Sequence, residues 1–148
     1  MSVVVAAARG WIGTPYRHQA SVRGAGTDCL GLVRGVWREV VGPEPFRAPP
    51  YTPDWSEPQQ DETLLRAGRR WLVPLGRDAP AAPGEVLLFR MRDSGIAKHL
   101  GILARRSAGR STFVHAYCGQ GVIESPLSEP WRRRIVARFR FPLPEPEA

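Results

Sequence analysis

The chain has 148 residues, 43% of them hydrophobic, which is enough for one hydrophobic core and predicts a single domain over residues 1–148. Its net charge of +7 is compatible with a polyanionic partner, but no zinc-finger, aromatic RNA-binding or helix-turn-helix pattern accompanies it, so nucleic acid is not the expected partner. Two cysteines are too few for a disulfide framework, and without a Cys-x-x-Cys pair we expect neither a metal nor a cofactor.

The N-terminal region is predicted to begin with a short helix over residues 2–12, capped by Ser2 and followed by Gly13 and Pro15. Its start is apolar but lacks the basic residues that precede the apolar run of a secretion signal. No run of about 18 apolar residues occurs in the chain. We therefore expect no membrane span, and synthesis in a cytoplasm with transport by another component if the protein acts outside it.

A second helix, of roughly four turns, is predicted to begin at Cys29. Thr27 or Asp28 can cap its free amides, and Gly42 followed by Pro43 ends it. Apolar residues recur from Cys29 at intervals of three and four, so the thiol heads the face that packs on the core. Because a helix start favours negative charge, this position predicts a lowered thiol pKa and a nucleophile. An inert buried cysteine is the alternative.

The middle of the chain is rich in proline over residues 43–58, which we expect to form an extended loop. Its aromatic residues, Phe46, Tyr51 and Trp55, predict that the loop packs onto a surface. A third helix is predicted over residues 59–72, with apolar residues on one side and arginines on the other.

From Pro83 onward the apolar residues recur with a period of two, which predicts strands. Five strands are expected in an antiparallel meander, over residues 84–89, 98–105, 112–117, 121–124 and 135–141. The tail over residues 142–148 is expected to leave the sheet as an extended segment. The predicted fold class is therefore α+β, with N-terminal helices packed on a C-terminal antiparallel sheet of about five strands.

Two histidines on neighbouring predicted strands are the candidates for acid–base chemistry. In a hairpin that turns near residues 105–109, the register that sets His99 opposite His115 puts both imidazoles on one face, together with the small Gly101. The start of the cysteine helix can dock there, which brings the Cys29 sulfur within hydrogen-bond reach of His99. Half-buried strand histidines without a catalytic role are the alternative.

Five blocks of sequence resemble, in the right order, those of the NlpC-type papain-like cysteine peptidases. They are Gly-Thr-Pro-Tyr at 13–16, Asp-Cys-Leu-Gly-Leu-Val at 28–33, Pro-Gly-Glu-Val-Leu-Leu-Phe at 83–89, Lys-His-Leu-Gly-Ile-Leu at 98–103 and Phe-Val-His-Ala at 113–116. The resemblance covers about residues 5–141 and is closest to the compact peptidases of phage tail and gene transfer agent clusters. It implies a papain-like fold and hydrolysis of the peptide stems of bacterial cell wall, at the bond between D-glutamate and diaminopimelate.

Carried over position by position, the resemblance makes Cys29 the nucleophile, His99 its base and His115 the group that orients the His99 ring. Tyr16 is expected near the thiol, where it helps to hold the oxyanion together with the backbone amide of Cys29. Asp28, beside the substrate site, is expected mainly to cap the helix.

The chain also departs from the family pattern. Leu30 stands where the family commonly has serine, and Arg17, His18 and Gln19 stand where it has an aromatic residue and glycines. Because these positions line the substrate cleft in relatives, we expect the departures to affect the choice of substrate. His18 is a candidate contact to a substrate carboxylate, with a solvated loop histidine as the alternative. Cys118, in a glycine-rich turn, is assigned no role.

The expected partners are peptidoglycan and the tail hub or baseplate proteins of a phage-like particle, which would carry the protein to the periplasm. The loop over residues 43–58 and the tail over residues 142–148 are the expected docking segments. Two alternatives remain open at this point, a structural tail-tip component with little activity and a basic nucleic-acid-binding module.

Overall fold

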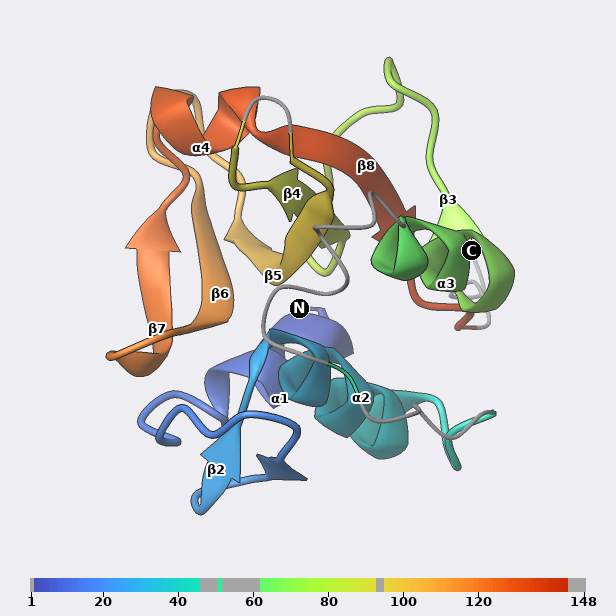
Figure 1. Ribbon diagram of the computed structural model, residues 1–148. Coiled ribbons are helices and arrows are strands. Elements are labelled where there is room, and N and C mark those ends of the chain that lie inside the picture. The colour runs from blue at the N-terminus through green and yellow to red at the C-terminus, as the bar shows by residue number, and fades with distance from the viewer. Residues whose placement is uncertain (1, 46–50, 52–61, 93–94, 144–148) are drawn as a thin grey trace.

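The computed structural model describes residues 2–45, 51, 62–92 and 95–143 (Figure 1). Helix α1 spans Val3–Arg9 and begins as predicted, because the Ser2 hydroxyl accepts a hydrogen bond of 3.2 Å from the amide of Val5. It ends earlier than predicted, because the chain turns at Gly10 and carries Trp11 into the core. Within the described residues, no helix is long and apolar enough to span a membrane.

Helix α2 spans Cys29–Val40 and confirms the predicted start at the cysteine. Asp28 is the cap, since its Oδ1 accepts from the amide of Gly31 at 2.7 Å, whereas the Thr27 hydroxyl donates to the Asp28 carbonyl. The segment just after α1 packs closely on α2 at Gly35, where an added Cβ would lie 2.0 Å from the ring of Trp11.

The sheet has six strands in the order β3-β8-β4-β5-β6-β7, and every neighbouring pair is antiparallel. Their bounds are β3 Val73–Pro74, β4 Val86–Arg90, β5 Ala97–Arg105, β6 Thr112–Tyr117, β7 Gly121–Pro126 and β8 Ile135–Arg140. All five predicted strands are present and the α+β class is confirmed. Three features were not predicted. They are the two-residue strand β3, the separate hairpin of β1 (Ser21–Val22) with β2 (Gly26–Thr27), and a short helix between β7 and β8.

The predicted meander is wrong at its last connection. After β7 the chain forms helix α4 (Glu129–Arg133), and β8 then returns to pair with β4 instead of with β7. Strand β8 thereby supplies hydrogen-bond partners to the backbone groups on the edge of β4 that β5 does not pair with.

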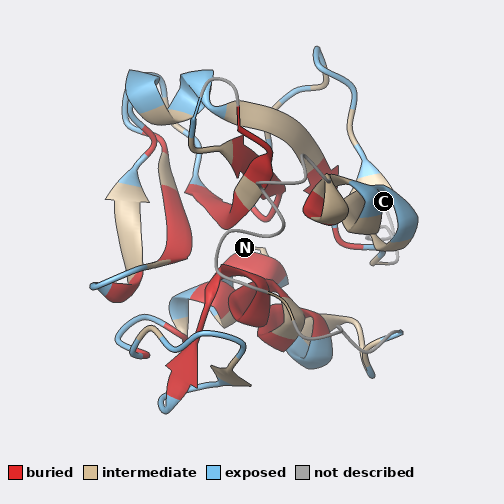
Figure 2. Cartoon of the chain, in the orientation of Figure 1, coloured by how far each residue is buried: buried red, intermediate tan, exposed pale blue. Residues whose placement is uncertain are grey.

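The two faces of the sheet bury different sets of side chains. One face packs on α1 and α2 through residues such as Val86, Leu88, Ile102 and Val114. The other buries Leu87, Phe89, Leu103 and Phe113 under Trp131 of α4. Figures 1 and 2 show α1 and α2 on one side of the sheet and α4 at the other, with buried segments on both sides of it.

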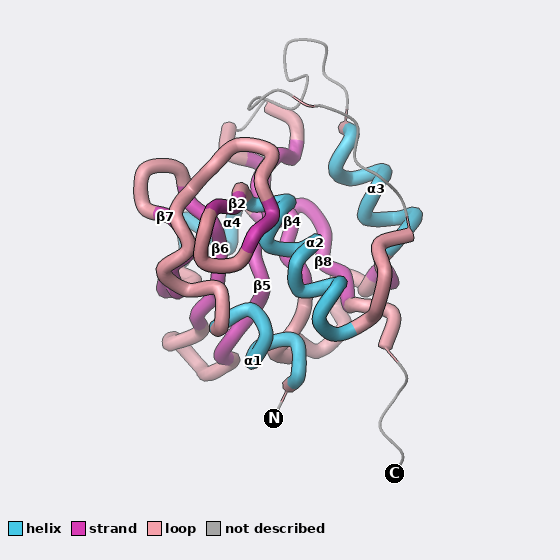
Figure 3. Tube along the Cα trace, turned by 90° about the horizontal axis from the view of Figure 1, so that it is seen from below, coloured by secondary structure: helices cyan, strands magenta, loops and turns pink. Residues whose placement is uncertain are grey.

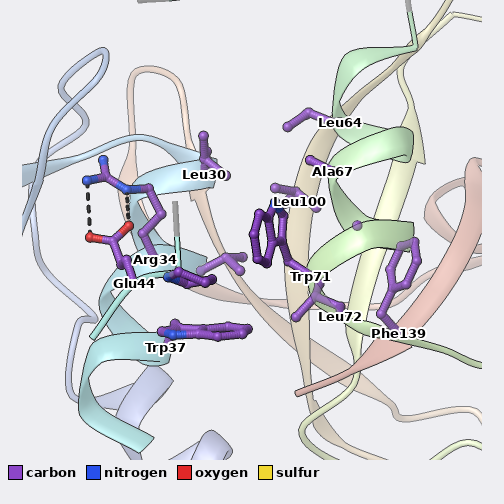
Figure 4. Close-up of a pocket in the computed structure, with 13 residues that line it drawn as sticks. Leu30, Arg34, Trp37, Glu44, Leu64, Ala67, Trp71, Leu72, Leu100 and Phe139 are labelled. Carbon is purple, nitrogen blue, oxygen red and sulfur yellow. Dashed lines mark hydrogen bonds and ion pairs between the residues drawn. The ribbon is translucent and has the colours of Figure 1, made fainter. Parts of the chain in front are cut away.

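Helix α3 spans Thr63–Trp71, inside the range predicted for it, of which residues 59–61 lie outside the described chain. In Figure 3 it lies beside α2 on the same side of the molecule. Figure 4 shows the apolar groove between the two helices, with Trp37 of α2 facing Trp71 of α3. At the groove rim Arg34 donates to Glu44 at 2.6 Å.

The two predicted docking segments are described only in part. In the proline-rich loop Tyr51 packs against the core, whereas Phe46 and Trp55 lie outside the described residues. In the tail Leu143 packs against the same core, and residues 144–148 lie outside the described chain. Docking by either segment therefore stays a prediction.

Candidate active site

Cys29 lines a cavity of about 170 Å³ at the start of α2. His99, at the beginning of β5, lines the same cavity, as do Tyr16 and Tyr117. The cysteine is 6% exposed, and its Sγ lies 3.8 Å from the carbonyl oxygen of Lys98, the residue before His99. The predicted docking in the gap at Gly101 is wrong, because α2 packs on the opposite face of the sheet and the ring of Phe113 fills that gap. The start of α2 instead reaches the end of β5 at Lys98, and no hydrogen bond joins Cys29 to His99 among the described residues.

The two strand histidines are hydrogen-bonded to each other. His99 Nε2 lies 2.8 Å from His115 Nδ1, and His115 Nε2 lies 2.9 Å from the hydroxyl of Ser125. The second bond lets His115 donate to Ser125 and accept from His99, a tautomer that leaves Nδ1 of His99 as its unprotonated nitrogen. Ser125 was missed because the fourth strand was predicted to end at Glu124.

The predicted register of these histidines is wrong by two residues. Ile102 pairs with Val114 and Leu103 with Phe113, which sets Gly101, and not His99, opposite His115. A bulge between Leu103 and Arg105 breaks the regular pairing near the turn, so the turn position alone did not fix the register. Because side chains alternate with a period of two, the shift leaves both imidazoles on one face, as predicted, with ring centroids 5.0 Å apart.

Aromatic rings enclose the histidine pair. Trp131 of α4 lies 5.6 Å from the His99 ring and 5.3 Å from the His115 ring, between centroids. Phe89 and Tyr117 complete the enclosure, each within 6 Å of the His99 ring. This enclosure lowers the pKa of His99 to about 3, by burial first and then by the charge of His115, and burial lowers that of His115 to about 4. Both rings are therefore neutral at physiological pH.

The expected lowering of the thiol pKa is wrong for this structure. Burial first, and then the negative charge of Asp28, raise the pKa of Cys29 to about 12. The amides of Leu100, Leu30 and Cys29 itself act in the other direction, as the helix-start argument required, but they are outweighed. The resting state is therefore a thiol beside a neutral imidazole.

Asp28 holds the segments around the cysteine together. Besides capping α2, its Oδ2 accepts from the amide of Gln19 at 2.8 Å and from the hydroxyl of Tyr51. His18 contacts the same pair, with Nε2 2.8 Å from the Tyr51 carbonyl oxygen and Nδ1 3.9 Å from the Asp28 carboxylate. His18 is thus packed in a polar cluster at the cavity, and its contact with a substrate carboxylate stays a prediction.

Tyr16 lies in the cavity wall, as predicted. Burial raises the pKa of its phenol above the ordinary value of 10.0, and the charges of Cys29 and Asp28 add to this effect. The hydroxyl therefore remains a hydrogen-bond donor at neutral pH, while its role toward an oxyanion stays a prediction.

Two further residues differ from the expectation. Cys118, to which no role was assigned, also lines the cavity. Leu30, expected in the substrate cleft, lines instead the apolar groove between α2 and α3 (Figure 4). No group of three or more His, Cys, Asp or Glu side chains suited to a metal ion occurs in the part of the chain that the structure describes.

Comparisons with known proteins identify the family of the chain. The sequence profile of the NlpC/P60 family matches residues 13–140. The chain is 30% identical over 125 residues to the Escherichia coli K12 protein "Murein DD-endopeptidase MepS/Murein LD-carboxypeptidase", a match that covers 84% of this chain and 54% of the relative. The chain thus corresponds to about half the length of that relative.

Solved structures show the same fold. The NlpC/P60 domain of the peptidoglycan hydrolase SagA superposes with a TM-score of 0.59 at 21% identity, over 94% of this chain and 97% of that one. An NlpC/P60 family protein from Bacillus cereus superposes with a TM-score of 0.63 at 18% identity, over 97% of this chain and 41% of that one. With the profile match over residues 13–140, these similarities establish that the chain belongs to the NlpC/P60 family and has its papain-like fold.

Proposed function

We propose that the protein is a cysteine peptidase that hydrolyses amide bonds in the peptide stems of peptidoglycan. The observation that carries the proposal is the shared cavity of Cys29 and His99, with His99 held by a buried bond to His115. Family membership and the murein endopeptidase similarity support the substrate class.

In the proposed reaction, Nδ1 of His99 takes the proton of the Cys29 thiol as the sulfur attacks the amide carbon. The buried neutral thiol makes proton transfer part of the attack, because a free thiolate is costly in the cavity. The imidazolium that forms donates through Nε2 to Nδ1 of His115, whose own proton points to Ser125. The backbone amide of Cys29 and the Tyr16 hydroxyl supply donors to the oxyanion.

The second half of the reaction regenerates the thiol. His99 returns its proton to the leaving amine, and the acyl group remains on sulfur as a thioester. Water then attacks the thioester while His99 accepts its proton, and the proton passes to the departing sulfur. One water molecule is consumed for each amide bond that is cleaved.

The bond that we propose is the one between D-glutamate and diaminopimelate, which the sequence resemblance implies. The test is mass spectrometry of the muropeptides released from purified sacculi. New amino termini on diaminopimelate are expected, whereas cleavage between two cross-linked stems would refute this assignment.

The catalytic assignment is tested with a matched pair of cysteine variants, since both cysteines line the cavity. Cys29→Ser should lower hydrolysis at least about a thousandfold, because the hydroxyl is a far weaker nucleophile beside the same base. Cys118→Ser should stay within a few-fold of the unchanged protein. Loss of activity in Cys118→Ser with retention in Cys29→Ser would overturn the assignment.

We also propose that the protein acts in the periplasm as part of a phage-like tail, bound to hub or baseplate proteins. The similarity of its sequence blocks to the peptidases of tail gene clusters supports this context. Phage-like particles purified from the host should contain the protein. Its presence only as free protein in the lysate would refute the proposal.

A further inference from the structure

A second groove lies at the opposite end of strands β5 and β6 from the catalytic cavity. Its volume is about 660 Å³, and its floor is apolar, formed by Leu87, Leu103, Leu127 and Ile135. The turn between β5 and β6 forms one side, with Arg106, and the segment around α4 forms the other, with Arg132. Arg106 lies seven positions after His99, just beyond the end of β5, which corresponds to about 23 Å along an extended chain.

The groove is preformed by hydrogen bonds across its two sides. Within the turn, the Ser111 hydroxyl donates to the carbonyl of Ser107 at 3.1 Å and accepts from its amide at 3.2 Å. The amide of Leu127, just before α4, donates to the carbonyl of Ser111 at 2.8 Å. The spacing between the turn and α4 is therefore set without a ligand.

The arginines that line the groove differ in what they already bind. Arg138 is occupied by an ion pair with the buried Glu85 and by backbone carbonyls of the preceding loop, including that of Ala79 at 2.9 Å. Arg106 has no ion-pair partner within the described residues. Among those residues Arg132 makes one side-chain hydrogen bond, in which its Nε donates to the carbonyl of Leu127. Two guanidinium groups above an apolar floor therefore retain donors for a ligand.

We propose that this groove, which we call the arginine groove, binds an acidic peptide stem of the same peptidoglycan polymer whose neighbouring stem is cut at Cys29. The proposal rests on the proposed function. Free carboxylates of a stem match the remaining guanidinium donors of Arg106 and Arg132, and its alanine methyl groups match the apolar floor. A polymer with repeated stems can occupy both sites at once, which raises the local concentration of substrate at the cavity.

The test compares two double variants that remove the same net charge. Arg106→Gln with Arg132→Gln changes the arginine groove, whereas Arg110→Gln with Arg133→Gln changes exposed neighbours that do not line it. Binding to purified sacculi is measured by sedimentation in a Cys29→Ala background, which prevents hydrolysis. In the active protein, hydrolysis of a short soluble stem peptide reports whether the fold and the catalytic cavity are intact.

The groove variant should bind sacculi about tenfold more weakly, as expected for the loss of two charge-assisted contacts, while its hydrolysis of the short peptide is unchanged. The control variant should bind like the unchanged protein. Equal weakening in both variants, weakening in neither, or a loss confined to binding of generic DNA or anionic vesicles would overturn the inference. If groove-dependent binding occurs but sacculi are never cut, the proposed function fails and the binding site stands.

Discussion

Acidification from pH 8 to pH 5 should destabilise this protein through its two enclosed histidines. In the folded chain the pKa of His99 is lowered to about 3 and that of His115 to about 4, from an ordinary 6.5. Below pH 6.5 the unfolded chain therefore binds protons at these positions that the folded chain does not, so acid favours unfolding. Their contribution to stability is complete above pH 6.5 and is lost as the pH falls toward the pKa values of the folded state.

The size of the effect follows from the same values. The interval from pH 6.5 to pH 5 is one and a half pH units. Each pH unit lowers the free energy of unfolding by about 1.4 kcal/mol for a group that stays neutral when folded. Each histidine then lowers the free energy of unfolding by about 2 kcal/mol, or about 4 kcal/mol for the two. This is a large part of the 5–15 kcal/mol, roughly, that stabilises a typical domain.

The assay is urea denaturation at pH 8, 7, 6 and 5 at constant ionic strength. Glu124 and Glu44 contribute little in this range, because a hydrogen bond with Arg9 lowers the pKa of Glu124, while the burial of Glu44 is outweighed by hydrogen bonds with its arginine partners, which lower its pKa. The chain has three histidines, and the double variant His99→Gln with His115→Gln serves as the control that should lose this pH dependence. A free energy of unfolding that is the same within about 1 kcal/mol at pH 8 and pH 5 would refute the enclosure of the pair.

Three further perturbations follow from the site. Asp28→Asn should increase the alkylation rate of Cys29 by iodoacetamide about tenfold at pH 8, because it removes a charge that raises the thiol pKa. The same change should lower the free energy of unfolding by about 1–3 kcal/mol, because buried donors lose their acceptor. Trp131→Ala should move the acid limb of the pH–activity profile to higher pH, because exposure returns the pKa of the histidines toward 6.5. Gly101→Ala should cost about 1–3 kcal/mol in thermal or urea unfolding, because its Cβ would lie 2.7 Å from a buried phenylalanine ring.

Each of these has a matched control or a contrary result. Asp78→Asn makes the same change on the surface and should alter neither alkylation nor stability. Gly76→Ala adds a methyl group where no atom lies within 4 Å and should be nearly neutral. Slower alkylation in Asp28→Asn, or an unmoved acid limb in Trp131→Ala, would contradict the electrostatic account of the cavity.

The histidine register shows how local and tertiary information divide in this chain. Alternation along a strand depends only on the chain itself, so the shared face of His99 and His115 could be predicted. Their offset could not, because a bulge between Leu103 and Arg105 changes the pairing, and a bulge is stabilised by packing rather than by a distinct residue pattern.

Cys29 shows the same division for electrostatics. The helix start, its Asp28 cap and the apolar face below the thiol were determined by local sequence signals, and all three are present. The protonation state was decided by tertiary structure, because the cost of burying a thiolate depends on how completely the rest of the fold removes water from it.

The sequence by itself thus determined the first three helices, the five main strands and the cysteine and histidine that meet at the cavity, since each depends on spacing along the chain. Only the tertiary structure decided the return of β8 to β4, the place of Ser125 beyond His115 and the cover of Trp131 over the histidines. These contacts join segments far apart in the chain, and their energies depend on distances that no local pattern records.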